Sequence, residues 1–141
     1  MDYPLRMIFS ASTTHALRAV ALLAERGGDD AVMARELAQK LKLPADYLTK
    51  VLGTLARTGV LTATRGVKGG YRLARPANRI RLIEVVEPFE GKRIRPGCLL
   101  RPDRACRDSG ACSAHRSWGE VKRTYLEFLE KRTVADIQDG V

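Results

Sequence analysis

The residues of this chain with the most distinctive chemistry are three cysteines and a histidine that lie close together in the sequence. Cys98, Cys106, Cys112 and His115 are spaced C-x7-C-x5-C-x2-H. Three thiolates and one imidazole can complete a tetrahedral zinc site or hold an iron–sulfur cluster. Nearby basic side chains favour the anionic thiolates that bind metal; they are Arg95, Arg101, Arg104, Arg107 and Arg116. The sequence therefore predicts a metal-binding loop and leaves zinc and iron–sulfur both open.

Two other interpretations of these residues are less well supported. Unligated cysteines are usually buried as small hydrophobic residues, whereas these lie in a stretch rich in proline, glycine and arginine. A cysteine–histidine enzyme would need a pocket and a third group to orient the histidine, and the sequence has no nucleophile motif or acidic cluster. We therefore predict that the protein is not an enzyme.

The second chemical feature is a concentration of positive charge. The chain has 141 residues, with 25 Lys and Arg against 16 Asp and Glu, for a formal net charge of +9. Between positions 40 and 81 there are ten basic residues and one acid, Asp46, so this segment accounts for the whole net charge. A block of one sign suits a phosphate backbone. We expect these cationic side chains to form one contiguous flank that fits against double-stranded DNA.

The hydrophobic pattern of this basic segment predicts two short helices. A first amphipathic helix precedes it. Ser10, Ser12 or Thr13 can cap its start, Gly27–Gly28 ends it, and its lone His15 is interpreted as structural. Apolar residues then recur at helical spacing over residues 33–41 and again after Pro44, which suits the first turn of a helix. Two short helices around a tight break are typical of a helix-turn-helix, although an ordinary helical hairpin has the same periodicity.

A hairpin is predicted directly after these helices. Residues 60–64 alternate apolar and polar, residues 65–70 are glycine-rich and basic, and residues 71–73 resume the strand pattern. The glycine-rich tip lacks the ending and the following helix of a nucleotide-binding loop. We interpret it as a wing whose Arg65 and Lys68 can reach DNA.

The remainder of the chain predicts a short helix from Leu82 that ends before Pro88, an irregular stretch over residues 88–112, and a last helix over residues 113–131. Large apolar side chains lie at spacings of three and four in that last helix; they are Trp118, Val121, Tyr125, Phe128 and Leu129. They require a partner surface, which is either the same domain or a second subunit.

These elements predict one compact, mainly helical domain with a small β-hairpin wing. We divide it into a winged helix-turn-helix over residues 1–87, a cysteine-rich loop over residues 88–115 and a dimerisation helix over residues 113–132. No run of about 18 apolar residues and no secretory signal is found, which predicts a cytoplasmic protein without a membrane partner.

The combination of these features resembles the Rrf2 family of winged-helix repressors, which includes IscR and NsrR. The resemblance rests on the Tyr47–Leu48 pair in the second helix of the helix-turn-helix, on the wing sequence RGVKGGYRLARP, and on three cysteines placed before the final helix. It implies a dimeric transcription regulator, and many members carry an iron–sulfur cluster that tunes their DNA affinity.

The resemblance also implies roles for individual residues. Positions in the family that face the major groove correspond to Asp46, Tyr47, Thr49 and Lys50, and the wing arginine that enters the minor groove corresponds to Arg65. The cluster cysteines correspond to Cys98, Cys106 and Cys112, and His115 matches the histidine ligand of members that hold a [2Fe-2S] cluster.

The expected function is that of a homodimer that represses or activates promoters at a pseudopalindromic operator. Its DNA affinity is expected to respond to an iron–sulfur cluster that senses redox state, iron–sulfur status or nitric oxide. The alternative is a zinc-stabilised or metal-free DNA-binding regulator in which the cysteine loop is only structural.

Overall fold

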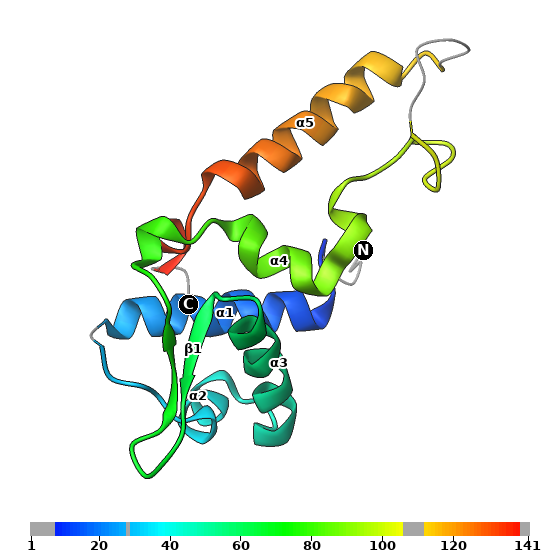
Figure 1. Ribbon diagram of the computed structural model, residues 1–141. Helices are drawn as coiled ribbons and strands as arrows, with labels where there is room; N and C mark the ends of the chain where they lie inside the picture. Colours follow the sequence, from blue (N-terminus) through cyan, green and yellow to red (C-terminus); the bar gives the residue numbers. More distant parts are fainter. Residues whose placement is uncertain (1–7, 28, 106–111, 139–141) are drawn as a thin grey trace, which may run out of the picture.

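The computed structural model describes residues 8–27, 29–105 and 112–138 (Figure 1). It is mainly helical, with one two-stranded antiparallel hairpin. The α-helices are α1 (Ala11–Arg26), α2 (Ala34–Leu41), α3 (Ala45–Arg57), α4 (Leu82–Glu90) and α5 (His115–Lys131); the strands are β1 (Leu61–Thr64) and β2 (Gly70–Leu73). There are also short 3-10 helices: η1 (Ala77–Arg79) before α4, η2 (Gly91–Ile94) directly after α4, and η3 (Val134–Asp136) after α5. The predicted winged helix-turn-helix fold is confirmed.

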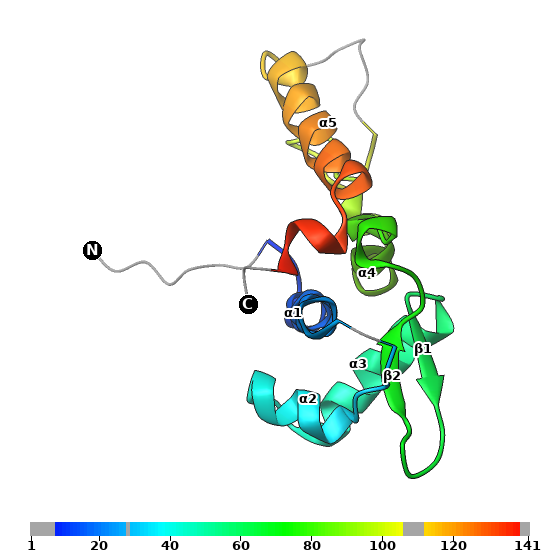
Figure 2. The ribbon, with the colours of Figure 1, turned by 90° about the vertical axis from the view of Figure 1, so that its left-hand side faces the viewer.

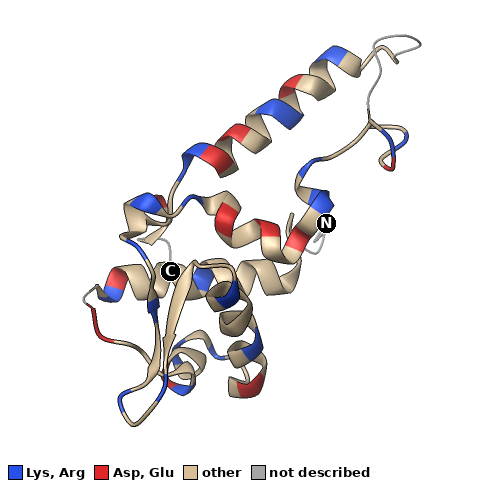
Figure 3. Ribbon diagram, viewed as in Figure 1, with Lys and Arg blue, Asp and Glu red and all other residues tan. Residues whose placement is uncertain are grey.

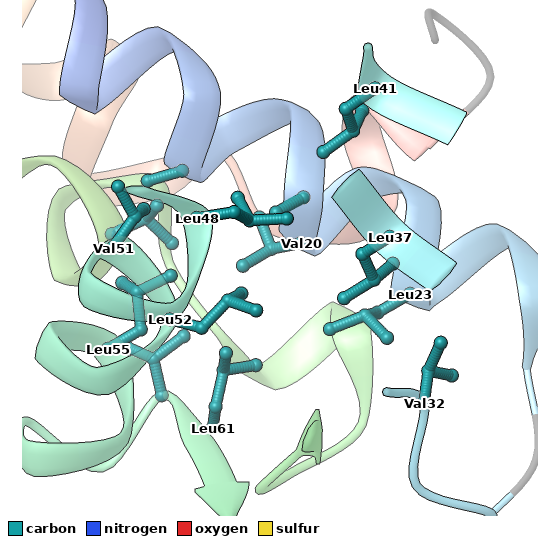
Figure 4. Packing of buried hydrophobic residues seen from close by; sticks show 14 of the residues in the cluster. Val20, Leu23, Val32, Leu37, Leu41, Leu48, Val51, Leu52, Leu55 and Leu61 are labelled. Carbon is teal, nitrogen blue, oxygen red and sulfur yellow. The ribbon is translucent and has the colours of Figure 1, made fainter. Parts of the chain in front are cut away.

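One hydrophobic core joins α1, α2, α3 and the base of the hairpin. Leucines and valines from these elements point toward one another in Figure 4, among them Val20, Leu37, Leu52 and Leu61. Leu52 is completely buried, and Leu37 and Leu61 are nearly so. Burial of aliphatic side chains of this size stabilises a fold by about 1.5–3 kcal/mol each. This core holds α3 in place.

The turn between α2 and α3 is tight and well bonded. Lys42, with φ at 58°, adopts the left-handed conformation that ends many helices. The Leu43 N–H donates to the Ala38 carbonyl at 2.9 Å, and the Leu48 N–H donates to the Pro44 carbonyl at 3.0 Å. Pro44 is the N-cap of α3. These bonds set the angle at which α3 leaves α2.

The hairpin is tied to the segment that leads into α2. Its register pairs Leu61 with Leu73, and Val32 forms an isolated bridge with Tyr71 through two hydrogen bonds of 2.8 Å each. Gly70 makes this approach possible, because its φ is 151° and a Cβ there would collide with the Val32 carbonyl. The wing is therefore attached to the helix-turn-helix in two ways: β1 follows α3 along the chain, and Tyr71 of β2 is bonded to Val32 just before α2.

Helix α4 extends further than the sequence predicted. We expected it to end before Pro88, but it continues to Glu90 with Pro88 inside it. A proline within a helix lacks its own N–H donor, yet the last turn still closes here because the Gly91 N–H donates to the Glu87 carbonyl. That prediction was wrong, and the extra turn carries Glu90 to the start of α1.

Helix α5 projects from the body of the protein: its C-terminal end lies against the body and its N-terminal end is far from it (Figures 1 and 2). The Leu82 N–H donates to the Arg132 carbonyl and the Val134 N–H donates to the Ile80 carbonyl, both at 2.9 Å. Val134 and Ile80 are both completely buried in the core. The C-terminal end of α5 is thus fixed to the body while the rest of the helix projects away from it.

None of the helices in the described part of the chain combines the length and the apolar character needed to cross a membrane.

Candidate nucleic-acid interface and cysteine loop

The outward face of α3 carries polar side chains. Asp46, Thr49 and Lys50 are exposed, whereas Leu48 and Leu52 on the opposite face are completely buried. The Thr49 hydroxyl donates to the Ala45 carbonyl at 2.8 Å. Three of the four residues predicted to face DNA therefore lie together on the exposed side of the first turns of α3.

The fourth residue, Tyr47, is placed differently. It is half-buried and packs against the core, and its hydroxyl oxygen lies 2.8 Å from His15 Nδ1 and 3.3 Å from Ser12 Oγ on α1. The two rings meet edge to face, with centroids 5.4 Å apart. The sequence pattern did not reveal this contact, because His15 and Tyr47 are 32 residues apart.

The wing presents its basic residues at an exposed tip. Arg65, Val67 and Lys68 are all exposed, and Val67 is 99% exposed. The tip and the first turn of α3 lie at the lower side of the molecule in Figure 1. Arg65 and Lys68 form no ion pair among the described residues, so both guanidinium and ammonium groups are available to an anionic partner there.

The expected cationic flank is formed only in part. In Figure 3 the positive charge covers the wing tip and parts of α2 and α3. At the other end of the hairpin, Arg75 Nη2 lies 2.6 Å from a Glu84 carboxylate oxygen and Arg81 Nε lies 3.8 Å from the other. Arg75 and Arg81 thus bind a carboxylate of α4, so they are less available to an anionic partner than the basic residues of α2, α3 and the wing tip.

The described part of the cysteine loop packs against the beginning of α5. The Trp118 indole N–H donates to the Gly97 carbonyl at 2.8 Å, and the Cys98 N–H donates to the Arg104 carbonyl at 2.8 Å. Cys98, Cys112 and His115 are half-buried. The segment that carries Cys98 is thereby held beside the helix whose first residue is His115.

The described part of the chain does not bring the predicted metal ligands Cys98, Cys112 and His115 together into one site. Among the residues that the structure describes, no three His, Cys, Asp or Glu side chains lie close enough together to hold a metal ion. Cys106 lies outside the described residues. The donor types of the four residues fit a zinc ion or an iron–sulfur cluster, and the described backbone places Cys98 and His115 on neighbouring segments.

A buried carboxylate connects the start of α1 to the end of α4. Glu90 is 6% exposed, and its Oε1 accepts from the Ser10 N–H at 2.6 Å and from the Thr13 hydroxyl at 2.9 Å. Burial alone would raise the pKa of Glu90, but these hydrogen bonds, with Arg93 nearby, leave it below its usual value. The ionised Glu90 therefore fixes the start of the cysteine loop to α1.

The projecting helix α5 exposes large apolar side chains. Val121 is 55% exposed and Phe128 is 51% exposed, and Leu129 is its one fully buried residue in the described part of the chain. Tyr125 packs against Phe9 with ring centroids 6.2 Å apart. Most of α5 therefore has no apolar partner within the described chain.

Comparison with known proteins assigns the family. The model of a family described as "Rrf2: Iron-dependent Transcriptional regulator" matches residues 9–140. A protein of Aquifex aeolicus (strain VF5), provisionally named an HTH-type transcriptional regulator, is 32% identical over 93% of this chain and 91% of its own length. A Rhodobacter capsulatus protein provisionally named rrf2-like is 29% identical over 87% of each chain.

Solved structures agree on the fold. CymR, titled the global cysteine regulator of B. subtilis, superposes with a TM-score of 0.79 at 21% identity, covering 98% of this chain and 99% of that chain. IscR of T. potens gives a TM-score of 0.72 at 24% identity, covering 96% of this chain and 88% of that chain. With a winged helix-turn-helix in place and a family model matched over almost its whole length, this chain belongs to the Rrf2 family of transcriptional regulators.

Proposed function

We propose that the protein is a homodimeric regulator that binds a pseudopalindromic operator through α3 and the wing, and that an iron–sulfur cluster in the cysteine loop tunes its affinity. It acts on cytoplasmic DNA as a regulator and not as an enzyme. The observation that carries the proposal is that the first turn of α3, whose polar side chains are exposed, lies on the same side of the molecule as the basic wing tip (Figures 1 and 3).

The proposed DNA contacts divide between two elements. Asp46, Thr49 and Lys50 on the first turns of α3 are exposed as base-reading side chains must be. Arg65 and Lys68 at the wing tip provide positive charge for phosphates or a narrow minor groove. Tyr47 contributes through the contact of its hydroxyl with His15 and Ser12 on α1.

The second subunit is proposed to cover the apolar face of α5. Val121 and Phe128 are too large and too exposed to be left in water along a helix of 17 residues without cost. Two-fold pairing of α5 would place two wings and two α3 helices on the same side of a dimer, which matches an operator with two half-sites.

The cysteine loop is proposed to hold the cluster through Cys98, Cys106, Cys112 and His115. A cluster bound there would supply sensitivity to redox state, iron or nitric oxide. The protein's own residues connect this loop to the rest of the molecule at two points. The Trp118 indole holds Gly97 against α5, and Glu90 holds the end of α4 to the start of α1. A change in the position of the loop would therefore be transmitted to α5 through Trp118 and to α1 through Glu90.

The cluster is tested by purifying the full chain without oxygen and measuring its visible absorption, iron and acid-labile sulfide. A coloured protein with both iron and sulfide supports the proposal. Cys98→Ala, Cys106→Ala and Cys112→Ala should each lower the iron content, and His115→Ala should change the spectrum. A colourless protein with one zinc per chain, or with no metal at all, supports the alternative regulator with a structural cysteine loop.

The DNA-binding part is tested independently of the cluster. The full chain is used to select duplexes from a random-sequence pool, and the selected duplex is titrated by fluorescence anisotropy at several salt concentrations. We expect a site with two related half-sites and an affinity that falls steeply with salt. Failure to retain any duplex at low ionic strength contradicts the proposal.

A further inference from the structure

The first turn of α3 is joined to α1 by a small polar cluster, which we call the hinge cluster, formed by Ser12, His15 and Tyr47. The Tyr47 hydroxyl lies 2.8 Å from His15 Nδ1 and 3.3 Å from Ser12 Oγ, and both partners belong to α1. The imidazole meets the phenol ring edge to face, with an interplanar angle of 87°. All three side chains are half-buried.

The hinge cluster provides directional bonds where the core provides none. Leu48 and Leu52 hold α3 on α1 by apolar packing, which tolerates small rotations and shifts. A hydrogen bond to a hydroxyl depends on distance and angle, so it limits those movements. Asp46 precedes Tyr47 directly, and Lys50 follows it by three positions. The cluster therefore determines where the proposed DNA-facing residues of α3 lie.

We infer that His15 is a positioning residue for DNA recognition. It holds the first turn of α3 through the Tyr47 hydroxyl, and protonation of its imidazole increases the affinity of the protein for DNA. This inference rests on the proposed function, namely that α3 enters the DNA groove.

The proton changes the direction of the hydrogen bond. In a neutral imidazole with its proton on Nε2, Nδ1 accepts from the Tyr47 O–H. When the ring takes up one proton from solvent, Nδ1 becomes a donor to the Tyr47 oxygen. The Tyr47 O–H is then released to donate to another acceptor, either Ser12 Oγ or a phosphate oxygen of DNA. The imidazolium also adds one positive charge beside the first turn of α3.

The charges around His15 agree with this assignment. Helix α1 and the elements packed against it carry charged groups of both signs: Arg18, Glu25 and Arg26 on α1; Asp46, Lys50 and Arg57 on α3; Arg35, Glu36 and Lys40 on α2; Glu84, Glu87 and Glu90 on α4, with Arg93 next to it; Arg72 on β2; and Asp136 on η3. Partial burial and then Arg18 hold the pKa of His15 below its usual value in the free protein. A nearby DNA phosphate would raise that pKa again, so DNA binding and protonation of His15 promote each other.

The sign of the effect follows from this linkage. DNA affinity should be constant at alkaline pH, rise as the pH falls through the pKa of His15 in the complex, and level off below its pKa in the free protein. One titrating group limits the change to about tenfold per pH unit per protomer.

The experiment compares four variants of the full chain on the duplex that the wild-type chain selects from a random pool. His15→Phe and Tyr47→Phe each keep an aromatic ring and lose the hydrogen bond. His15→Asn keeps an amide near the position of Nδ1 but does not titrate. The double variant completes a thermodynamic cycle. His115 remains in every variant, so a pH effect lost in His15→Asn belongs to His15.

We expect Tyr47→Phe and His15→Phe each to weaken binding by about two- to tenfold, the size of one net hydrogen bond. The double variant with His15→Phe and Tyr47→Phe should bind DNA no more weakly than the single variant with the lower affinity. His15→Asn should bind like the wild type near pH 8 and lose the increase in affinity toward about pH 5.5. Additive losses, or a pH profile of His15→Asn that matches the wild type, would overturn the inference.

A second measurement separates this inference from the proposed function. The ¹⁵N chemical shifts of the His15 ring are titrated in the free protein, with and without Tyr47→Phe. A titration that moves when the Tyr47 hydroxyl is removed supports the coupling even if the wild-type chain retains no duplex, a result that would contradict the proposed function alone. A His15 titration identical in both proteins overturns the coupling.

Discussion

The winged helix-turn-helix body and the α5 arm are built on different principles. The body buries most of its large aliphatic side chains between α1, α2, α3 and the hairpin, whereas α5 buries Leu129 and exposes Val121 and Phe128. The body therefore contains the interactions it needs in one chain. The arm has an apolar face whose partner is not found in the described chain, which is the pattern of a surface made for association.

The largest effect on this comparison is expected from a core substitution in the body. Leu52→Ala removes a completely buried side chain at the centre of the helix-turn-helix, and it should lower the free energy of unfolding by about 2–5 kcal/mol. Urea denaturation followed by circular dichroism measures this loss. Val121→Ala on α5 is the matched control and should cost less than about 1 kcal/mol at protein concentrations too low for association. Equal losses would show that the body and the arm are not distinct.

The arm is tested by placing a charge on its apolar face. Phe128→Glu should raise the dissociation constant of the proposed dimer by at least about tenfold, because a half-exposed aromatic on an apolar face is a typical binding hot spot. Analytical ultracentrifugation measures the change. Glu130→Gln, on the same helix and exposed, should leave the dimer intact. A monomeric wild-type chain would contradict the proposed role of α5.

The proposed DNA-binding surface of the body is tested at the wing. Arg65→Ala should weaken operator binding by about 1–3 kcal/mol and reduce its salt dependence by about one counterion. Fluorescence anisotropy over a range of salt concentrations gives both quantities. Arg132→Ala removes the same charge from the end of α5 and should have little effect. Unchanged affinity of Arg65→Ala at every salt concentration would refute the proposed contact.

The connection between body and arm is tested through Glu90. Its pKa is lowered in the folded protein, so its stabilising effect is complete above the ordinary pKa of glutamate and is lost as the pH falls through the lowered value. Glu90→Gln should cost about 1 kcal/mol at neutral pH, the difference between hydrogen bonds to charged and neutral acceptors. Urea midpoints of wild type and variant should converge in acid. Glu87→Gln, exposed on the same helix, should show no such convergence; a constant difference for Glu90→Gln would contradict the charge-based explanation.

The elements that could be predicted from the sequence are those with local signals. The repeats of leucine and alanine in α1, α2 and α3 gave the helix-turn-helix, and the glycine-rich basic tip between two strand patterns gave the wing. The length of α4 was not predicted. Pro88 was expected to end the helix, whereas the helix continues past it to Glu90 although the proline has no N–H donor. Local patterns describe an element well but its last turn poorly.

Contacts between distant segments could not be predicted in the same way. Tyr47 was assigned to the DNA-facing side of α3 by the resemblance to the family, yet its hydroxyl reaches His15 on α1. Glu90 was not singled out from the sequence, because only the fold brings it to Ser10 and Thr13. The cysteine spacing predicted the donor types, but how loop residues converge depends on backbone geometry that spacing does not encode.

The segment after α5 has a consequence for the order in which the protein is built. Val134 fills a completely buried position and its N–H caps the Ile80 carbonyl, so residues that leave the ribosome late complete a core begun by residues that leave it early. Proteins are generally structured from the N-terminal side during synthesis. We therefore expect α1 and the helix-turn-helix to stay incompletely packed until translation has passed α5, so that the nascent chain contains the whole arm before its core is complete.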